Sequence, residues 1–226
     1  MFKKRILKNY RKFGIEPSSE LLEYATFCDK YSEDLIDSAG LQHALCTYLD
    51  KVSLRHQALS ESINRYKEPP MADTFTESVN MAVGAILNND LFKGCQLTVS
   101  SEKNFAMKDG KYLKPDVGIW RKNILIFTVE CKTNLGYDRG SWKTHFENKT
   151  NKYTKNGIKP EGITWLVATE SNWAGFPSND PRTGTNWLCL CHRGSWFGGK
   201  NNSSKLSESM NPGVVESIIN SIVSVI

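Results

Sequence analysis

Two apolar segments that follow each other closely in the chain carry charged residues near their ends, and this combination limits the folds available to it. The segments read YLKPDVGIW and NILIFTVECK, and the residues RKN between them are typical of a tight turn. Side chains alternate between the two faces of a strand, so Glu130 and Lys132 share one face and Cys131 points to the other. We therefore expect two neighbouring strands that bring Asp116, Glu130 and Lys132 together.

Two carboxylates and an ammonium group at one place cost electrostatic energy unless something compensates, and a divalent cation is the simplest compensator. Phosphodiester hydrolysis needs an activated water, neutralisation of the pentavalent transition state and stabilisation of the leaving oxygen. Mg²⁺ held by a few carboxylates can supply all three. We expect Asp116 and Glu130 to bind Mg²⁺, for which Mn²⁺ would substitute, with the backbone carbonyl of Cys131 as a further ligand. Lys132 would then orient the attacking water and stabilise the developing negative charge.

The composition indicates a soluble protein with a core of ordinary size. The chain has 226 residues, of which 39% are hydrophobic, its mean hydropathy is −0.43, and its apolar runs are too short to span a membrane. The basic N-terminus is not followed by the apolar run of a secretory signal. Six cysteines without a CxxC pair predict reduced thiols in a cytoplasm. Cys189, Cys191 and His192 offer metal ligands, but two buried cysteines on a strand explain this spacing better.

The net charge of +5 is unevenly distributed along the chain. Residues 1–12 contain six basic and no acidic side chains, residues 16–77 contain twelve acids and five bases, and residues 139–160 contain six bases and one acid. The last of these basic clusters begins seven residues after Lys132, where it could bind a polyanion. Any single lysine there could instead belong to a solvated helix face. We expect phosphate contacts from Asn134, Arg139, Lys143 and Lys149.

The pattern of the first 68 residues predicts helices. Apolar residues recur at helical intervals over 18–31 and 32–52, and a third helix is expected over 53–66. Pro69 and Pro70 then break the pattern. We therefore expect a helical region over 1–70 and a second region over 71–226.

The second region alternates between strand and helix patterns. The expected elements are a helix over 74–88, strands at 96–101, 112–120 and 123–132, a helix over 141–155, strands at 163–170 and 186–191, and a helix over 211–226. This order predicts an α/β fold of the α+β kind, in which helices flank a mixed sheet.

The residues KPD on one strand and ECK at the end of the next, after an acid-bearing helix and before a basic one, resemble the motif of the PD-(D/E)XK nuclease superfamily. The resemblance covers about the central hundred residues, and TNLGYDRGSW after the motif resembles bacterial restriction-type and defence nucleases. It implies a restriction-endonuclease-like core with the order αβββαβ over residues 74–170, in a bacterial or archaeal cytoplasm. It also implies that Asp116 and Glu130 bind Mg²⁺ and that Lys132 assists the nucleophilic water.

Members of this superfamily often have another acid on the helix that precedes the sheet, and Glu77 is the candidate here. Thr74 and Glu77 are also spaced as a capping box, in which the glutamate bonds back to the N-cap amide. Both interpretations of Glu77 remain open from the sequence.

Two segments near the C-terminus are rich in Asn, Ser, Arg and Gly, which are residue types that read base edges or follow a nucleic-acid backbone. They could equally be ordinary long connections. If the enzyme is sequence-specific, we expect base readout from Asn179, Arg182, Asn186 and Arg193.

These observations predict a type II site-specific deoxyribonuclease that acts on double-stranded DNA as a homodimer, because a twofold enzyme matches a palindromic site. The helical region over 1–70 would serve dimerisation or embrace the DNA. Two alternatives are a repair, structure-specific or defence nuclease, and a non-catalytic nucleic-acid-binding module of the same fold.

Overall fold

A mixed sheet of six strands forms the centre of the computed structural model, which describes residues 1–32, 37–62, 72–133, 139–169, 179–180, 185–191 and 205–226. Its strands, in spatial order, are β1 (Leu97–Ser101), β4 (Val117–Arg121), β5 (Ile124–Lys132), β6 (Ile163–Thr169), β8 (Thr185–Cys191) and β7 (Asn179–Asp180). The first three strands are antiparallel, β5, β6 and β8 are parallel, and β7 is antiparallel to β8. The expected mixed α/β architecture is therefore confirmed.

The turn between β4 and β5 and a β-bulge beside Ile119 and Trp120 together set the register of the two strands that carry the motif. Lys122 and Asn123 have φ values of +47° and +68°, and a turn of two left-handed residues matches the twist of antiparallel strands. The pairing that starts at this turn ends with Val117 opposite Val129. Asp116, one residue before β4, therefore lies beside the last residues of β5.

A small hairpin that the sequence did not predict is inserted between β1 and β4. It consists of β2 (Phe105–Ala106) and β3 (Tyr112–Leu113), which pair antiparallel in a separate sheet. A turn at Asp109 and Gly110 lies inside this hairpin, and Gly110 has a φ of +80°. The prediction of one strand over 112–120 is wrong, because residues 114–116 separate β3 from β4 and the two strands belong to different sheets. Strands of two residues are too short to give an alternating pattern of their own.

In the described residues, six α-helices and three short 3₁₀ turns surround the sheet. They are α1 (Phe2–Lys12), α2 (Ser19–Tyr31), α3 (Ser38–Ser62), α4 (Ala72–Leu87), η1 (Asp90–Phe92), α5 (Arg139–Lys155), η2 (Pro160–Gly162), η3 (Leu206–Glu208) and α6 (Val214–Val225). The prediction of a separate helix from Ser53 is wrong, because α3 continues through it and the Ser53 hydroxyl bonds back to the carbonyl of Asp50. Among the helices that the structure describes, none has the length and apolar character needed to cross a bilayer.

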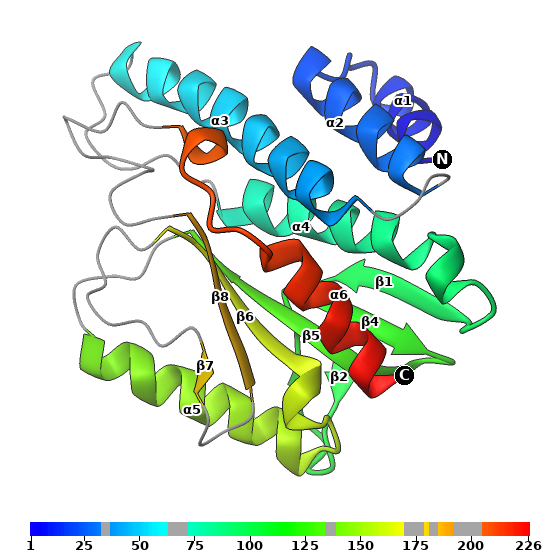
Figure 1. Cartoon of the computed structure of the whole chain (residues 1–226), viewed down its shortest axis with the longest axis vertical. Coiled ribbons are helices and arrows are strands. Elements are labelled where there is room, and N and C mark those ends of the chain that lie inside the picture. Colours follow the sequence, from blue (N-terminus) through cyan, green and yellow to red (C-terminus); the bar gives the residue numbers. More distant parts are fainter. Residues whose placement is uncertain (33–36, 63–71, 134–138, 170–178, 181–184, 192–204) are drawn as a thin grey trace.

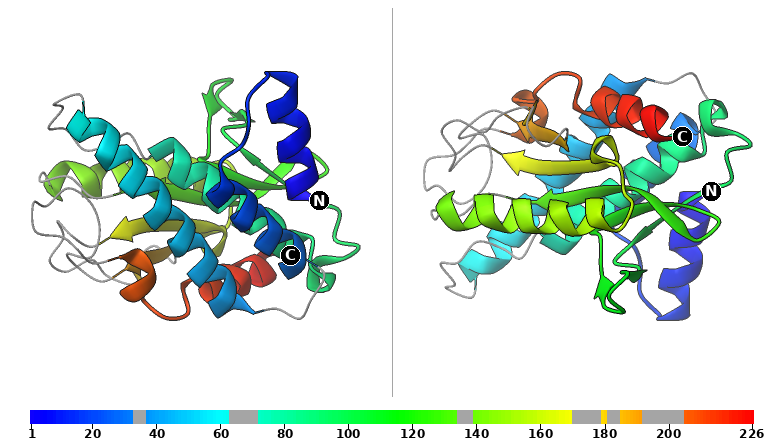
Figure 2. Two further views of the ribbon diagram at one scale, coloured as in Figure 1. Left: turned by 90° about the horizontal axis from the view of Figure 1, so that it is seen from above. Right: turned by 90° about the horizontal axis from the view of Figure 1, so that it is seen from below.

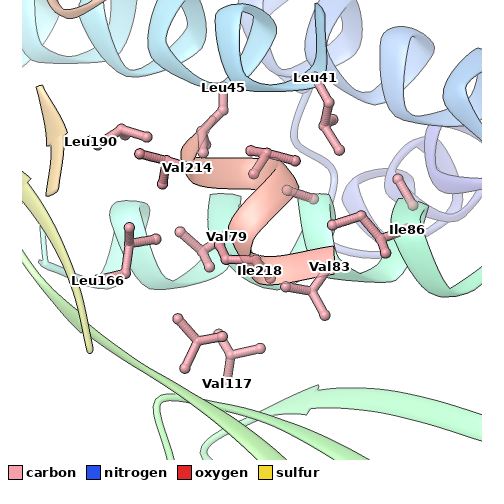
Figure 3. Close-up of a cluster of buried hydrophobic side chains, with 14 of the residues drawn as sticks. Leu41, Leu45, Val79, Val83, Ile86, Val117, Leu166, Leu190, Val214 and Ile218 are labelled. Atoms are coloured by element: carbon pink, nitrogen blue, oxygen red, sulfur yellow. The ribbon is translucent and has the colours of Figure 1, made fainter. Parts of the chain in front are cut away.

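The helices cover both faces of the sheet. Helices α4 and α6 lie on one face and α5 lies on the other, while α2 and α3 form a further layer beyond α4 (Figure 1). Each face has its own apolar cluster, the larger one beneath α4 and α6 and the smaller one, rich in tryptophan, beneath α5. Figure 3 shows the larger cluster, which combines side chains of α3 (Leu41, Leu45), α4 (Val79, Val83, Ile86), α6 (Val214, Ile218) and the strands (Val117, Leu166, Leu190).

The N-terminal helices share this larger core with the strands of the sheet. The hydroxyl of Tyr24 in α2 donates to the carbonyl of Ser78 in α4 at 2.8 Å, and Tyr24 is buried. The expected boundary at Pro69 and Pro70 falls outside the described residues. Within the described ranges, the helices before residue 63 pack directly on the part of the chain that carries the motif.

Candidate functional site

Asp116 and Lys132 are brought into contact by the register of β4 and β5. The Oδ2 atom of Asp116 accepts a hydrogen bond from the backbone N–H of Cys131 at 2.8 Å and lies 3.6 Å from the Nζ atom of Lys132. The side chains of Asp116 and Lys132 are 23% and 24% exposed, so a ligand in solution can reach both. Because one carboxylate oxygen is held by the backbone of the neighbouring strand, Asp116 has a fixed orientation beside Lys132.

The backbone around Asp116 is held by close packing on both sides. The N–H of Glu102, just after β1, donates to the carbonyls of Pro115 and Asp116 at 3.1 and 3.3 Å. Gly118 has no room for a side chain, since a Cβ atom there would lie 3.1 Å from Cγ of Pro115 and 2.9 Å from Cδ1 of Leu125. A side chain at position 118 would therefore displace Pro115 or Leu125.

Glu130 points to the opposite face of β5 from Cys131, as the alternation predicts, and is completely buried beneath α5. Its Oε1 atom accepts a hydrogen bond from the hydroxyl of Tyr153 and another from Thr128 Oγ1 at 3.2 Å. Its Oε2 atom forms an ion pair with the ammonium group of Lys149. Lys149 and Tyr153 are four residues apart on α5, so they lie on the same side of that helix.

The environment of Glu130 favours its protonated form more than water does. Burial raises the pKa of Glu130, the positive charge of Lys149 opposes this rise, and the negative charge of Asp116 adds to it. Burial and the neighbouring Glu130 also raise the pKa of Tyr153, which keeps its hydroxyl a donor. The two carboxyl groups are therefore close enough to influence each other, as a shared cation site requires.

Cys131 contributes its backbone rather than its thiol. Its side chain belongs to the larger apolar cluster, and burial raises the pKa of the thiol well above its usual range. In an extended strand the N–H and C=O of one residue point to the same edge. The N–H of Cys131 points to Asp116, so its carbonyl lies on the same side of β5. The last pair between β4 and β5 is Val117 with Val129, so Cys131 lies past the end of that pairing.

A Mg²⁺ site formed by Asp116, Glu130 and the carbonyl of Cys131 remains a prediction. In the described part of the chain, no group of three or more His, Cys, Asp or Glu side chains is arranged to hold a metal ion. Mg²⁺ does not require such a group, because it is usually bound through one or two carboxylates and keeps several waters. Asp116, Glu130 and the carbonyl of Cys131 form such a donor set, although Glu130 would have to exchange its contact with Lys149 for the ion.

Glu77 lies near the same end of the sheet. Its Oε1 atom accepts a hydrogen bond from Ser101 Oγ at 2.6 Å, and Ser101 pairs with Val117, next to Asp116. The capping-box interpretation is wrong, because α4 already begins at Ala72 and Thr74 is inside the helix. The role of Glu77 as a fourth metal-site acid remains a prediction.

The remaining predicted residues have different placements. Lys149 was expected to contact phosphate, but its ammonium group is paired with Glu130. The Nδ2 atom of Asn186 donates to the carbonyl of Glu161 at 3.1 Å and to Ser221 Oγ at 2.8 Å. Asn186 pairs with Thr164 near the start of β6, whereas Lys132 pairs with Val167 further along. Phosphate contact by Lys149 and base readout by Asn186 remain predictions, although their polar hydrogens already have partners within the fold.

For the other predicted contacts the structure gives little or no placement. Arg139 and Lys143 are in the first turns of α5, which follows the motif as expected, and Asn179 is in β7; only their backbones are described. Asn134, Arg182 and Arg193 lie outside the described residues.

Sequence reasoning missed part of what α5 contributes. Tyr153 on α5 is buried, and its hydroxyl binds Glu130. His145 is four residues before Lys149 on α5. Burial lowers the pKa of His145, and the nearby positive charges of Lys132 and Lys149 lower it further. The spacing of His145, Lys149 and Tyr153 at intervals of four is the signal that could have identified this polar face of the helix.

Comparisons of the chain with protein-family models, with curated proteins and with solved structures found no match. The function must therefore be inferred from the residues of the site and their chemistry.

Proposed function

We propose that the chain is a Mg²⁺-dependent endonuclease of the PD-(D/E)XK type, with a restriction-endonuclease-like core, that hydrolyses double-stranded DNA at a specific short sequence. The observation that carries this proposal is the contact of Asp116 with both Lys132 and the N–H of Cys131, beside the buried Glu130. Two acids and one partly exposed ammonium group, where β4 begins and β5 ends, suit a metal-assisted attack on a phosphate.

The residues of this site would divide the work of hydrolysis. Asp116, Glu130 and the Cys131 carbonyl would hold Mg²⁺, which when bound supplies an activated water and neutralises charge on the phosphate. Lys132 would orient the attacking water and stabilise the charge that develops on the transferred phosphate. Its ammonium group can do both because Asp116 fixes its position while a quarter of the side chain stays exposed.

Lys149 and Tyr153 would act by positioning Glu130 rather than by touching the substrate. Tyr153 holds one carboxylate oxygen in place, and Lys149 offsets the cost of burying the negative charge. A metal ion bound by Glu130 would compete with the ammonium group of Lys149 for the same oxygen. The activity of the enzyme would therefore depend on the pKa of Glu130 and on its contact with Lys149.

The pH dependence of cleavage tests this role of Lys149. Cleavage needs ionised Glu130, so activity is present above the raised pKa of this group and is lost as the pH falls through it. Because the charge of Lys149 lowers this pKa, Lys149→Met is expected to move the acid limb of the pH–rate profile to higher pH. The measurement is the single-turnover cleavage rate between pH 5 and 9.

Lys152→Met is the matched control, since Lys152 is an exposed lysine on the same helix. It is expected to leave the acid limb where it is in the unaltered chain. Identical limbs in both variants would show that Lys149 does not tune Glu130.

Two alternatives use the same residues. A repair, structure-specific or defence nuclease would have the same chemistry without sequence readout. A non-catalytic nucleic-acid-binding module is favoured by one observation, namely that both oxygens of Glu130 already have partners within the fold. The accessible pair of Asp116 and Lys132 favours the enzyme. In a module that only binds DNA, the negative charge of Asp116 would repel the phosphates and weaken binding.

Sequencing the ends of digested plasmid DNA separates these possibilities. A type II restriction enzyme, acting as a homodimer on a symmetric site, gives discrete fragments whose termini share one short palindrome. A nuclease without readout gives a smear with unrelated termini. Absence of any cleavage with Mg²⁺ or Mn²⁺, together with retained DNA binding, would identify the non-catalytic module.

A further inference from the structure

Helix α1 presents a dense stripe of positive charge. Its basic residues are all exposed and no acidic residue accompanies them; they are Lys3, Lys4, Arg5, Lys8, Arg11 and Lys12. At about 100° per residue, all of them except Lys3 fall within an arc of about 120° on the helix surface. Lys4, Lys8 and Arg11 lie within about 60° of one another on this stripe, and the apolar residues Phe2 and Ile6 lie on the opposite side of the helix.

The helix is held in place by specific contacts, so the stripe has a fixed position. The carboxylate of Asp29 in α2 accepts hydrogen bonds from the N–H groups of Phe2 and Lys3 at the N-terminus of α1. Phe2 is buried against α4, where Gly84 leaves room for its ring, since a Cβ atom there would lie 3.1 Å from Phe2 Cζ. Ile6 packs against the same apolar cluster.

The stripe begins close to the helix that carries Glu77. Arg5 of α1 and Glu77 of α4 line one pocket of about 170 Å³, and Glu77 bonds to Ser101 opposite Val117. In both views of Figure 2, α1 and the hairpin of β2 and β3 project from the same side of the molecule. Helix α1 therefore lies on the same side of the molecule as the hairpin that ends three residues before Asp116.

We infer that the stripe of Lys4, Lys8 and Arg11 is a second DNA-binding surface, which contacts the phosphates of one strand beside the cleavage site. This inference rests on the proposed nuclease function and names the part of the N-terminal region that embraces the DNA. The stripe is about 10 Å long, the rise of about three successive phosphates along one strand. Its contacts are with the backbone, so they add affinity without reading sequence.

A membrane surface is the other polyanion that a basic helix can bind. A helix that lies on a bilayer needs a free apolar face, whereas Phe2 and Ile6 of α1 are packed inside the protein. Phe13, which is 72% exposed just after the helix, is the feature that a membrane contact would use. The position of the apolar face favours DNA, and vesicles form a separate arm of the test.

The test compares the triple variant Lys4→Gln, Lys8→Gln, Arg11→Gln of the full chain with a control that loses the same charge. The control is Lys30→Gln, Lys93→Gln, Lys122→Gln, which changes three exposed lysines outside α1. Binding of a fluorescent 30-base-pair duplex is measured by anisotropy in EDTA between 50 and 200 mM salt. We expect the slope of log K against log salt to become shallower by about two to three in the α1 variant, and not in the control.

Each outcome decides the inference separately from the nuclease proposal. Equal slopes in both variants would overturn the role of α1, whether or not the chain cleaves DNA. A shallower slope in the α1 variant alone would support it even if Mg²⁺ produced no cleavage, in which case the nuclease proposal fails instead. Binding to vesicles of phosphatidylcholine and phosphatidylserine that needs the α1 charges, with no change in the slope for DNA, would identify a membrane surface and overturn the inference.

Discussion

Lys132→Gln is expected to slow DNA cleavage by about 10³-fold, because it removes the positive charge that would stabilise the transferred phosphate and orient the water. The Nζ atom of Lys132 lies 3.6 Å from Asp116 Oδ2, and the glutamine side chain keeps the polarity but loses the charge. The measurement is the single-turnover rate of plasmid nicking with saturating Mg²⁺. Folding should be unaffected, since the side chain is partly exposed.

Lys122→Gln provides the matched control for this prediction. Lys122 is an exposed lysine in the turn at the opposite end of β4 and β5, and its replacement is expected to leave the cleavage rate unchanged. If Lys132→Gln cleaved DNA as fast as Lys122→Gln, the ammonium group of Lys132 would have no part in the chemistry.

Asp50→Ala is expected to lower the free energy of unfolding by about 3–5 kcal/mol, since several buried donors would lose a charged acceptor. The carboxylate of Asp50 in α3 is buried and accepts hydrogen bonds from Leu206 N at 2.7 Å, Ser207 N at 3.0 Å and Ser207 Oγ at 2.7 Å. These bonds join α3 to η3, so they tie the N-terminal helices to the end of the chain. Urea denaturation monitored by circular dichroism measures the change.

Asp90→Ala is the control for this stability prediction. Asp90 pairs only with the i+3 residue Lys93 among the described contacts, and both side chains are at least four-fifths exposed. Its loss is expected to change the stability by less than about 0.5 kcal/mol. If Asp50→Ala also changed the free energy of unfolding by less than about 0.5 kcal/mol, this carboxylate would not hold α3 and η3 together.

The parts of the fold that depend on local patterns could be predicted from the sequence. The alternation in NILIFTVECK placed Glu130 and Cys131 on opposite faces of β5, and the two residues after Arg121 formed the expected turn. The helix after the motif and the strand beginning at Ile163 were also anticipated, because their patterns are long enough to be distinctive. Asp116 lies next to Lys132 also because of a one-residue register shift beside Ile119 and Trp120, which the pattern did not predict.

The parts that depend on contacts between distant residues could not be predicted. Lys149 looked like one more base in a basic segment, and only the packing of α5 on the sheet shows that it meets Glu130. Asp50 gave no signal either, because its partners are about 156 residues away along the chain. The capping box at Thr74 is wrong because α4 already begins at Ala72, and Glu77 instead accepts a hydrogen bond from the distant Ser101 on β1.

The central claim is that Asp116, Glu130 and Lys132 form a Mg²⁺-dependent nuclease site, and conversion of supercoiled plasmid to nicked and linear forms tests it most directly. The comparison needs three samples: the unaltered chain with Mg²⁺, the same chain with EDTA, and Asp116→Ala with Mg²⁺. We predict cleavage in the first sample and none in the other two, with Asp116→Ala still folded by circular dichroism. Cleavage by Asp116→Ala at the rate of the unaltered chain, or equal cleavage in EDTA, would contradict the claim.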